Sequence, residues 1–116
     1  MASPLFIFTQ SPSASDHVRE GIEALLACAA FDMHPDVLFL DQGILQLIPT
    51  EDIIGTKNLN KMINAFEIYG VKTIYADGKS LLNFGLQPEQ INPQPTILHE
   101  SNYAQLITQA SWIMRF

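Results

Sequence analysis

Short apolar runs alternate with amphipathic stretches along the whole chain. The apolar runs are predicted as buried strands, at residues 5–8, 37–40, 71–76, 96–98 and 112–116. The stretches between them are predicted as helices, at residues 18–29, 57–69, 79–84 and 101–110. This order predicts an α/β fold in three layers, α/β/α, with a mainly parallel five-stranded sheet covered by helices on both faces. The length of 116 residues and the lack of a linker predict one domain over residues 1–116.

Few charged residues are present to cover such a domain. Hydrophobic residues make up 47% of the chain and charged residues only 16%, against about 25% in an average soluble domain. A small domain that cannot bury all its apolar side chains usually has the rest covered by a partner. We therefore expect an oligomer from composition alone.

The charge balance and the cysteine count exclude several classes of protein. The net charge of −6 opposes direct binding to nucleic acid, which requires neutralisation of phosphates. The single cysteine excludes an internal disulfide and a cysteine-rich metal site, and we expect neither a metal nor a cofactor. No apolar run approaches the roughly 20 residues of a membrane span, and the N-terminus lacks the basic region of a signal peptide. We expect a cytoplasmic chain without a membrane partner.

One loop carries the residues of a possible anion site. Asp77, Gly78, Lys79 and Ser80 follow a predicted strand and open a helix, at the edge of the sheet where α/β proteins bind ligands. A phosphate-binding loop would need its first glycine at Thr73, so that motif is incomplete. Lys79 and the free N–H groups at the helix start could still hold an anion. Ordinary capping of the helix by Asp77 and Ser80 is the simpler interpretation.

Two further side chains could carry chemistry. His17 stands beside Asp16 in the first turn of a predicted helix, either as a surface histidine or as a catalytic base. Cys28 lies in the middle of the same helix among leucines and alanines. A reactive thiol needs a helix N-terminus or a cationic neighbour and some exposure, so Cys28 is predicted to be inert packing.

Apolar residues after the second strand and at the C-terminus are candidates for a partner-contact surface. The segment between Gly43 and Pro49 is poorly placed for a core helix and is interpreted as a loop or short strand. Exposed aromatic residues at a chain end would need a cover. The possible interface comprises Ile44, Leu45, Leu47, Ile48, Trp112 and Phe116. Packing of the 44–48 segment over the chain's own core is the alternative.

Several segments stand in a distinctive order and spacing from one end of the chain to the other. They are Phe6-Ile7-Phe8 with Pro12, Arg19-Glu20-Gly21 with Ala24–Ala27, Gly43 with Gln46–Pro49, Phe66 with Gly70, Ser80-Leu81 with Gly85–Pro88, and Ile113–Phe116. In this arrangement the chain resembles the TusC/DsrF family, within the DsrE-like group. No single motif is diagnostic, but R-E-G-x-x-A-L-L-A, Q-L-I-P and a terminal R-F are fairly specific in combination.

The resemblance implies a DsrE-like fold, flavodoxin-like in general appearance, and membership of a larger complex. That complex is a heterohexamer, a dimer of heterotrimers, containing sister TusB/DsrH-like and TusD/DsrE-like subunits. In one branch of the family it passes persulfide sulfur between small sulfur-carrier proteins, toward 2-thiouridine at the wobble position of tRNA. In the other branch it serves dissimilatory sulfur oxidation. The persulfide-bearing cysteine is implied to belong to the TusD/DsrE sister, in the loop after the third strand.

In this chain the corresponding loop, 76–80, contains no cysteine. The resemblance therefore implies a non-catalytic subunit of a sulfurtransferase complex for tRNA thiolation, without activity of its own. Two alternatives remain: a subunit of a DsrEFH-type sulfur-oxidation complex, and a stand-alone anion-binding α/β enzyme that uses Asp77, Lys79 and His17.

Overall fold

A five-stranded parallel sheet forms the centre of the molecule. The computed structural model describes residues 3–11, 16–49 and 57–116. The strand order is β4-β3-β2-β1-β5, and every described pair of neighbouring strands is parallel. The strands are β1 (Ser3–Phe8), β2 (Asp36–Phe39), β3 (Thr73–Asp77), β4 (Thr96–Leu98) and β5 (Ala110–Arg115). The predicted α/β class and the parallel sheet are confirmed.

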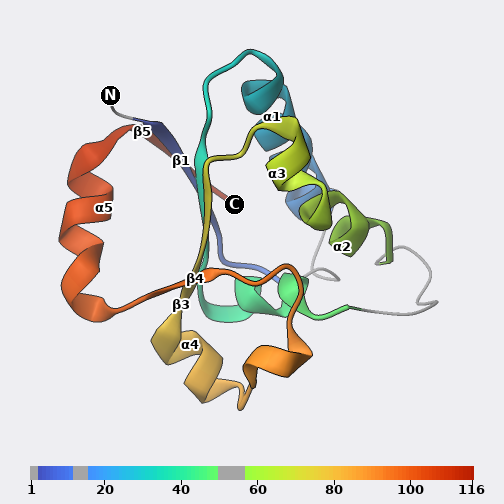
Figure 1. Cartoon of the computed structure of the whole chain (residues 1–116), viewed down its shortest axis with the longest axis vertical. Helices are drawn as coiled ribbons and strands as arrows, with labels where there is room; N and C mark the ends of the chain where they lie inside the picture. The colour runs from blue at the N-terminus through green and yellow to red at the C-terminus, as the bar shows by residue number, and fades with distance from the viewer. Residues whose placement is uncertain (1–2, 12–15, 50–56) are drawn as a thin grey trace.

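Helices cover the two faces of the sheet unequally, as Figure 1 shows. One face carries α1 (Asp16–Ala30), α2 (Lys57–Asn64) and α3 (Phe66–Tyr69), and the other carries α5 (Tyr103–Gln109). The short α4 (Gly78–Asn83) follows β3 directly. Three 3₁₀ helices complete the described chain: η1 (Asp41–Leu47), η2 (Pro88–Gln90) and η3 (Glu100–Asn102). None of the helices in the described residues is long and apolar enough to cross a membrane.

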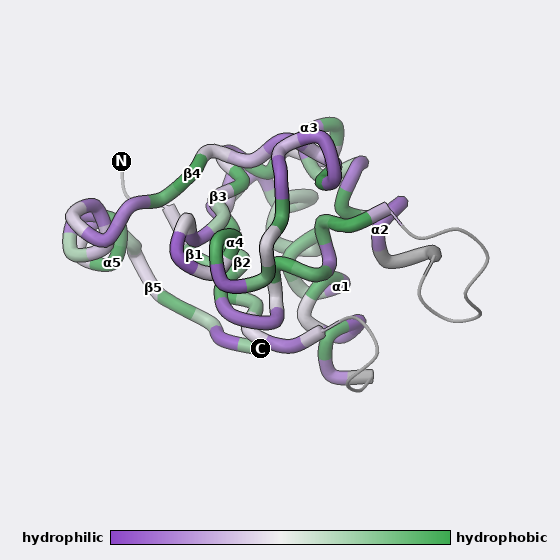
Figure 2. Tube along the Cα trace, turned by 90° about the horizontal axis from the view of Figure 1, so that it is seen from below, coloured by the Kyte–Doolittle hydropathy of each residue, from purple (hydrophilic) through white to green (hydrophobic). Residues whose placement is uncertain are grey.

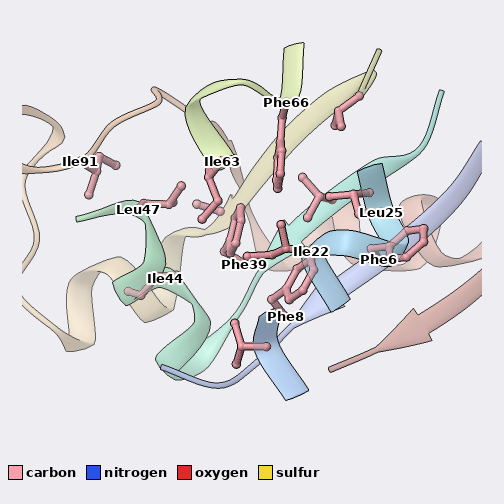
Figure 3. Close-up of a cluster of buried hydrophobic side chains, with 14 of the residues drawn as sticks. Phe6, Phe8, Ile22, Leu25, Phe39, Ile44, Leu47, Ile63, Phe66 and Ile91 are labelled. Carbon is pink, nitrogen blue, oxygen red and sulfur yellow. The ribbon is translucent and has the colours of Figure 1, made fainter. Parts of the chain in front are cut away.

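The alternation of side chains along β1 divides the core into two parts. Phe6 and Phe8 point into the larger cluster, between the sheet and α1, whereas Leu5 and Ile7 point into a smaller cluster beneath α5. Figure 3 shows the larger cluster, in which Phe39 of β2 and Ile22 of α1 lie against Phe8. The continuous apolar run of β1 is therefore explained by burial on both faces.

The predicted helix at 57–69 and the segment at 44–48 both differ from expectation. The helix is divided at Ala65 into α2 and α3, and ends as predicted at Gly70, whose φ is 103°. The 44–48 segment was predicted to lie outside the core, but η1 buries Ile44 and Leu47 completely. They point into the same cluster as Ile63 (Figure 3).

Gly43 explains why η1 turns inward. A Cβ at this position would lie 1.9 Å from the carbonyl oxygen of Phe8, so only glycine lets η1 pass this close to the end of β1. The alternative interpretation, packing over the chain's own core, is therefore right for Ile44 and Leu47, and these two residues cannot face a partner in this fold. Leu45 and Ile48 remain partly exposed.

Gly21 is a second position where the packing leaves no room for a side chain. A Cβ there would lie 2.6 Å from Cγ of Phe116 and 2.8 Å from the ring of Phe8. Ala27, on the same helix, is exposed. We expect Gly21→Leu to lower the free energy of unfolding by at least about 1–3 kcal/mol, the usual cost of overpacking, and Ala27→Leu to change it little. Urea unfolding followed by circular dichroism measures both, and equal midpoints for the two variants would refute this orientation of α1.

Candidate functional site

The loop after β3 lies where the carboxyl ends of the central strands meet. Asp77 is both the last residue of β3 and the N-cap of α4. Its Oδ2 accepts hydrogen bonds from the backbone N–H of Ser80 at 3.0 Å and from the Ser80 hydroxyl at 2.6 Å. The predicted capping role of Asp77 is confirmed, and it fixes the first turn of α4.

Two other loops are tied to this cap. The Tyr103 hydroxyl, at the start of α5, donates to Oδ1 of Asp77 at 2.5 Å. The backbone N–H of Asp41, at the start of η1, donates to the Ser80 hydroxyl oxygen at 2.9 Å. Asp77 and Ser80 therefore connect the segments that follow β2, β3 and β4. We call Asp41, Asp77, Ser80 and Tyr103 together the Asp77 network.

The network keeps Asp77 ionised and Tyr103 protonated. Burial raises the pKa of the Asp77 carboxyl, but the hydrogen bonds from Ser80, Tyr103 and the Lys79 backbone outweigh it and leave that pKa below its ordinary value. Burial and the hydrogen bond to Asp77 raise the pKa of Tyr103. A carboxylate that already accepts these bonds, with its pKa held low, is poorly suited to act as a general base at neutral pH.

A cavity of about 820 Å³ opens beside the network, between α4 and the segment that follows β4. Its walls are mostly apolar, and the apolar lining includes Leu40, Leu81, Leu82, Leu86, Ile91, Ile97 and Leu98. Lys79, His99 and Glu100 supply charged or titratable groups to the lining. Gly78 lets α4 approach β4, because a Cβ there would lie 3.1 Å from Cγ2 of Ile97.

The structure separates the three residues of the hypothetical anion-binding enzyme. Asp77 and Lys79 line the cavity, but His17 does not. His17 lies at the start of α1, where its Nδ1 is 3.7 Å from Oε2 of Glu20 and its ring is 5.3 Å from that of Phe116. Among the described residues, no group of three or more His, Cys, Asp or Glu side chains could hold a metal ion.

Sequence reasoning missed Tyr103 and His99, which the fold brings to this loop. Both follow β4, and β4 is the neighbour of β3 in the sheet. Tyr103 is 26 positions from Asp77, to which it donates its hydrogen bond, so no local sequence motif links the two residues. The signal that could have found them is topological: in a parallel sheet, the segments after adjacent strands meet at one edge.

Comparison with known proteins assigns this arrangement to a family. The DsrE/DsrF-like family matches residues 3–116. The chain belongs to the DsrE/DsrF-like family. It is 32% identical over 107 residues to a protein named "Protein TusC homolog" of Pseudomonas aeruginosa, covering 90% of each chain. A protein of the same name from Vibrio parahaemolyticus is 25% identical over 118 residues and the full length of both chains. The resemblance seen in the sequence is thus confirmed.

Solved structures confirm the fold independently. The ychN protein from E. coli superimposes over the full length of both chains with a TM-score of 0.86 at 11% identity. A conserved protein of unknown function from Bacteroides thetaiotaomicron gives a TM-score of 0.73 at 14% identity, covering 98% of this chain and 95% of its own. At these identities the likeness extends to the fold alone.

The only thiol of this DsrE/DsrF-like chain lies away from the Asp77 network. Cys28 is 8% exposed in α1, within the larger core cluster, and it does not line the cavity. Burial raises the pKa of its thiol. Its Sγ is 3.6 Å from Sδ of Met33, a contact between two weakly polar groups. Cys28 therefore has the burial and the protonation of a packing residue.

Removing the Asp77 carboxylate should destabilise the fold in a pH-dependent way. Asp77→Ala loses a helix cap, at a cost of about 1 kcal/mol, and leaves Ser80 and Tyr103 without their acceptor. Because the folded pKa of Asp77 is below its unfolded value of about 3.9, its stabilisation is present above that pH and is lost as the pH falls through the folded pKa. Urea unfolding at neutral and acidic pH should show the difference between Asp77→Ala and wild type shrinking in acid. Glu89→Ala removes an exposed carboxylate and serves as the control. If the free energy of unfolding lost in Asp77→Ala is as independent of pH as that lost in Glu89→Ala, the role of the network is contradicted.

Proposed function

We propose that this chain is a TusC-type subunit of a sulfur-relay complex and that it carries no persulfide itself. Its family membership and its likeness to TusC homologues over nearly the whole chain support the first part. The reaction that the complex serves under this proposal is 2-thiolation of the wobble uridine in tRNA. The partners are TusB/DsrH-like and TusD/DsrE-like sister subunits, with small sulfur-carrier proteins as the donor and acceptor of sulfur.

The main observation against a persulfide on this chain is that both oxygens of the Asp77 carboxylate already accept hydrogen bonds. A persulfide relay needs an exposed, ionised thiolate that attacks the outer sulfur of a donor persulfide and releases the donor thiolate. The acceptor thiolate then attacks the outer sulfur of the new persulfide, and the relay thiolate leaves. The loop after β3 offers a carboxylate at this place, and both of its oxygens accept hydrogen bonds. The chain's only thiol is buried and its pKa is raised. The loop therefore supports structure where a sister subunit would supply the chemistry.

The same geometry argues against the stand-alone enzyme. Asp77 is committed to Ser80 and Tyr103, and His17 does not line the cavity that Asp77 lines. Of the three residues of that hypothesis, only Lys79 is both exposed and part of the loop after β3. Between tRNA thiolation and sulfur oxidation, the likeness to TusC homologues favours tRNA thiolation.

A subunit of this kind should present apolar surface to its sisters. Several large apolar side chains of the described residues are exposed: Leu82 on α4, Phe84 just after it, Phe31 just after α1, and Ile68 on α3. Leu45 and Ile48 of the predicted interface are also partly exposed, whereas Ile44 and Leu47 belong to the core. Burial of such side chains would account for the low charged fraction of the chain.

The purified chain should not accept sulfur from a persulfide donor. We expect no stable label after incubation with a ³⁵S-labelled persulfide, because Cys28 is buried and protonated. The readout is label retained on the folded protein after desalting, and lost on addition of a reducing thiol.

Two variants make this test decisive. Cys28→Ser removes the only thiol and should match wild type, so label that disappears in this variant would overturn the proposal. Lys79→Cys places a thiol at an exposed position of the loop after β3 and should take up label, which serves as the positive control. Circular dichroism before the assay verifies that each variant is folded.

A further inference from the structure

The cavity beside the Asp77 network lies at the end of the sheet where three neighbouring strands finish. Its lining includes Leu40 directly after β2, Asp77 at the end of β3 and Leu98 at the end of β4. Figure 2, seen from below Figure 1, looks onto this end of the sheet and shows hydrophobic stretches in α4. The carboxyl ends of parallel strands are where α/β proteins bind ligands. The volume of about 820 Å³ is also within the range of small-molecule sites, roughly 300–1,000 Å³.

Hydrogen bonds hold the outer wall of the cavity in place. The segment between α4 and β4 forms this wall. The side-chain amide of Gln94 donates to the carbonyl of Pro88 at 2.7 Å and to that of Ile91 at 2.9 Å. The N–H of Asn92 donates to the carbonyl of Leu47, in η1, at 2.7 Å. The wall is therefore fixed to the rest of the chain, and the cavity is formed before any ligand arrives.

The apolar lining of the cavity continues from the interior to the surface. Leu81 and Leu98 are only 9% and 4% exposed, whereas Leu82 is 81% exposed and Ile97 40%. Removing apolar surface of this kind from water is favourable, and the gain is proportional to the area covered. The body of a ligand that fills the cavity is therefore expected to be apolar.

Most polar groups around the cavity are already bonded, but the Lys79 ammonium is not. The backbone N–H groups of Lys79 and Ser80 both donate to Asp77, so the start of α4 has no free cradle for a phosphate. The Tyr103 hydroxyl also donates to Asp77. Lys79 is exposed, lines the cavity and makes no ion pair with any residue that the structure describes. An acidic head group on the ligand would give this ammonium a partner.

Two further titratable side chains, His99 and Glu100, limit the charge of that head group. Both are exposed and line the cavity. The His99 ring can donate a hydrogen bond to an acidic group, whereas the Glu100 carboxylate repels one. One ammonium beside one opposing carboxylate suits a single negative charge and disfavours a polyanion such as a nucleotide.

We propose that the cavity binds a small organic acid with an apolar body, of the class of aromatic or branched aliphatic carboxylic acids. Lys79 pairs with the acidic head group at the mouth of the cavity. The apolar body covers the leucines of the lining, including the exposed Leu82. The proposal is independent of the sulfur relay, because this binding needs neither a thiol nor a sister subunit.

Two fluorescent dyes that share one ring system test the head group. Anilinonaphthalene sulfonate carries one negative charge, and phenylnaphthylamine is its uncharged counterpart. Lys79→Gln should raise the dissociation constant of the sulfonate by about two- to fivefold, as expected for an exposed ion pair. The same variant should leave that of the uncharged dye unchanged. Glu100→Gln should lower the dissociation constant of the sulfonate, and Lys61→Gln, at an exposed lysine of α2 outside the cavity, should change neither.

A second pair of variants tests the apolar body. Leu82→Asn should raise the dissociation constants of both dyes by roughly threefold or more, because it makes the lining polar. Ile68→Asn is the matched control, since Ile68 is 86% exposed on α3 and does not line the cavity. Circular dichroism verifies that every variant is folded.

Three results would each overturn the proposal. They are a wild type that binds neither dye saturably, a sulfonate affinity that Lys79→Gln leaves unchanged or that Lys61→Gln lowers equally, and equal effects of Leu82→Asn and Ile68→Asn. Sulfur transfer is measured separately, so failure here leaves the proposed function unaffected.

Discussion

The Asp77 carboxylate holds together the edge of the sheet at which an α/β protein normally places its chemistry. It caps α4 through Ser80 and receives the hydroxyl of Tyr103, while Ser80 receives the N–H of Asp41. Three loops that are distant in sequence thereby keep one arrangement. Because its oxygens are already occupied, the position contributes rigidity to the site and offers neither a base nor a nucleophile.

Much of the fold could be predicted from the period of the apolar residues. Phe6, Ile7 and Phe8 are a run that only a strand buried on both faces explains, and Gly70 ends α3 with the positive φ expected of a cap. The prediction was wrong at 44–48, where the helix-like and strand-like patterns are too short to separate. Burial there depends on the absence of a Cβ at Gly43, because a Cβ would lie 1.9 Å from the carbonyl oxygen of the distant Phe8. No local rule contains that contact.

Only the part of the candidate site that is contiguous in sequence could be predicted. Asp77 and Ser80 are three residues apart, so the cap is visible in the sequence. Tyr103, Asp41 and the walls of the cavity come from segments after other strands, and only the strand order β4-β3-β2 brings them together. His17 was interpreted either as a surface histidine or as a catalytic base. Its residue type invites a catalytic interpretation, but its place at the start of α1 puts it beside Phe116 and Glu20.

The two edges of the sheet show how one parallel fold can limit where it associates. A parallel sheet has two open edges, and each is a template for an added strand. Here the short β4, which follows Pro95, closes one of them. The other, β5, is interrupted by an irregularity between Ala110 and Ile113, and its Trp112, Ile113 and Met114 are exposed. Exposed apolar side chains beside an open edge form the kind of surface that a partner usually covers, and the low charged fraction of 16% agrees with such a cover.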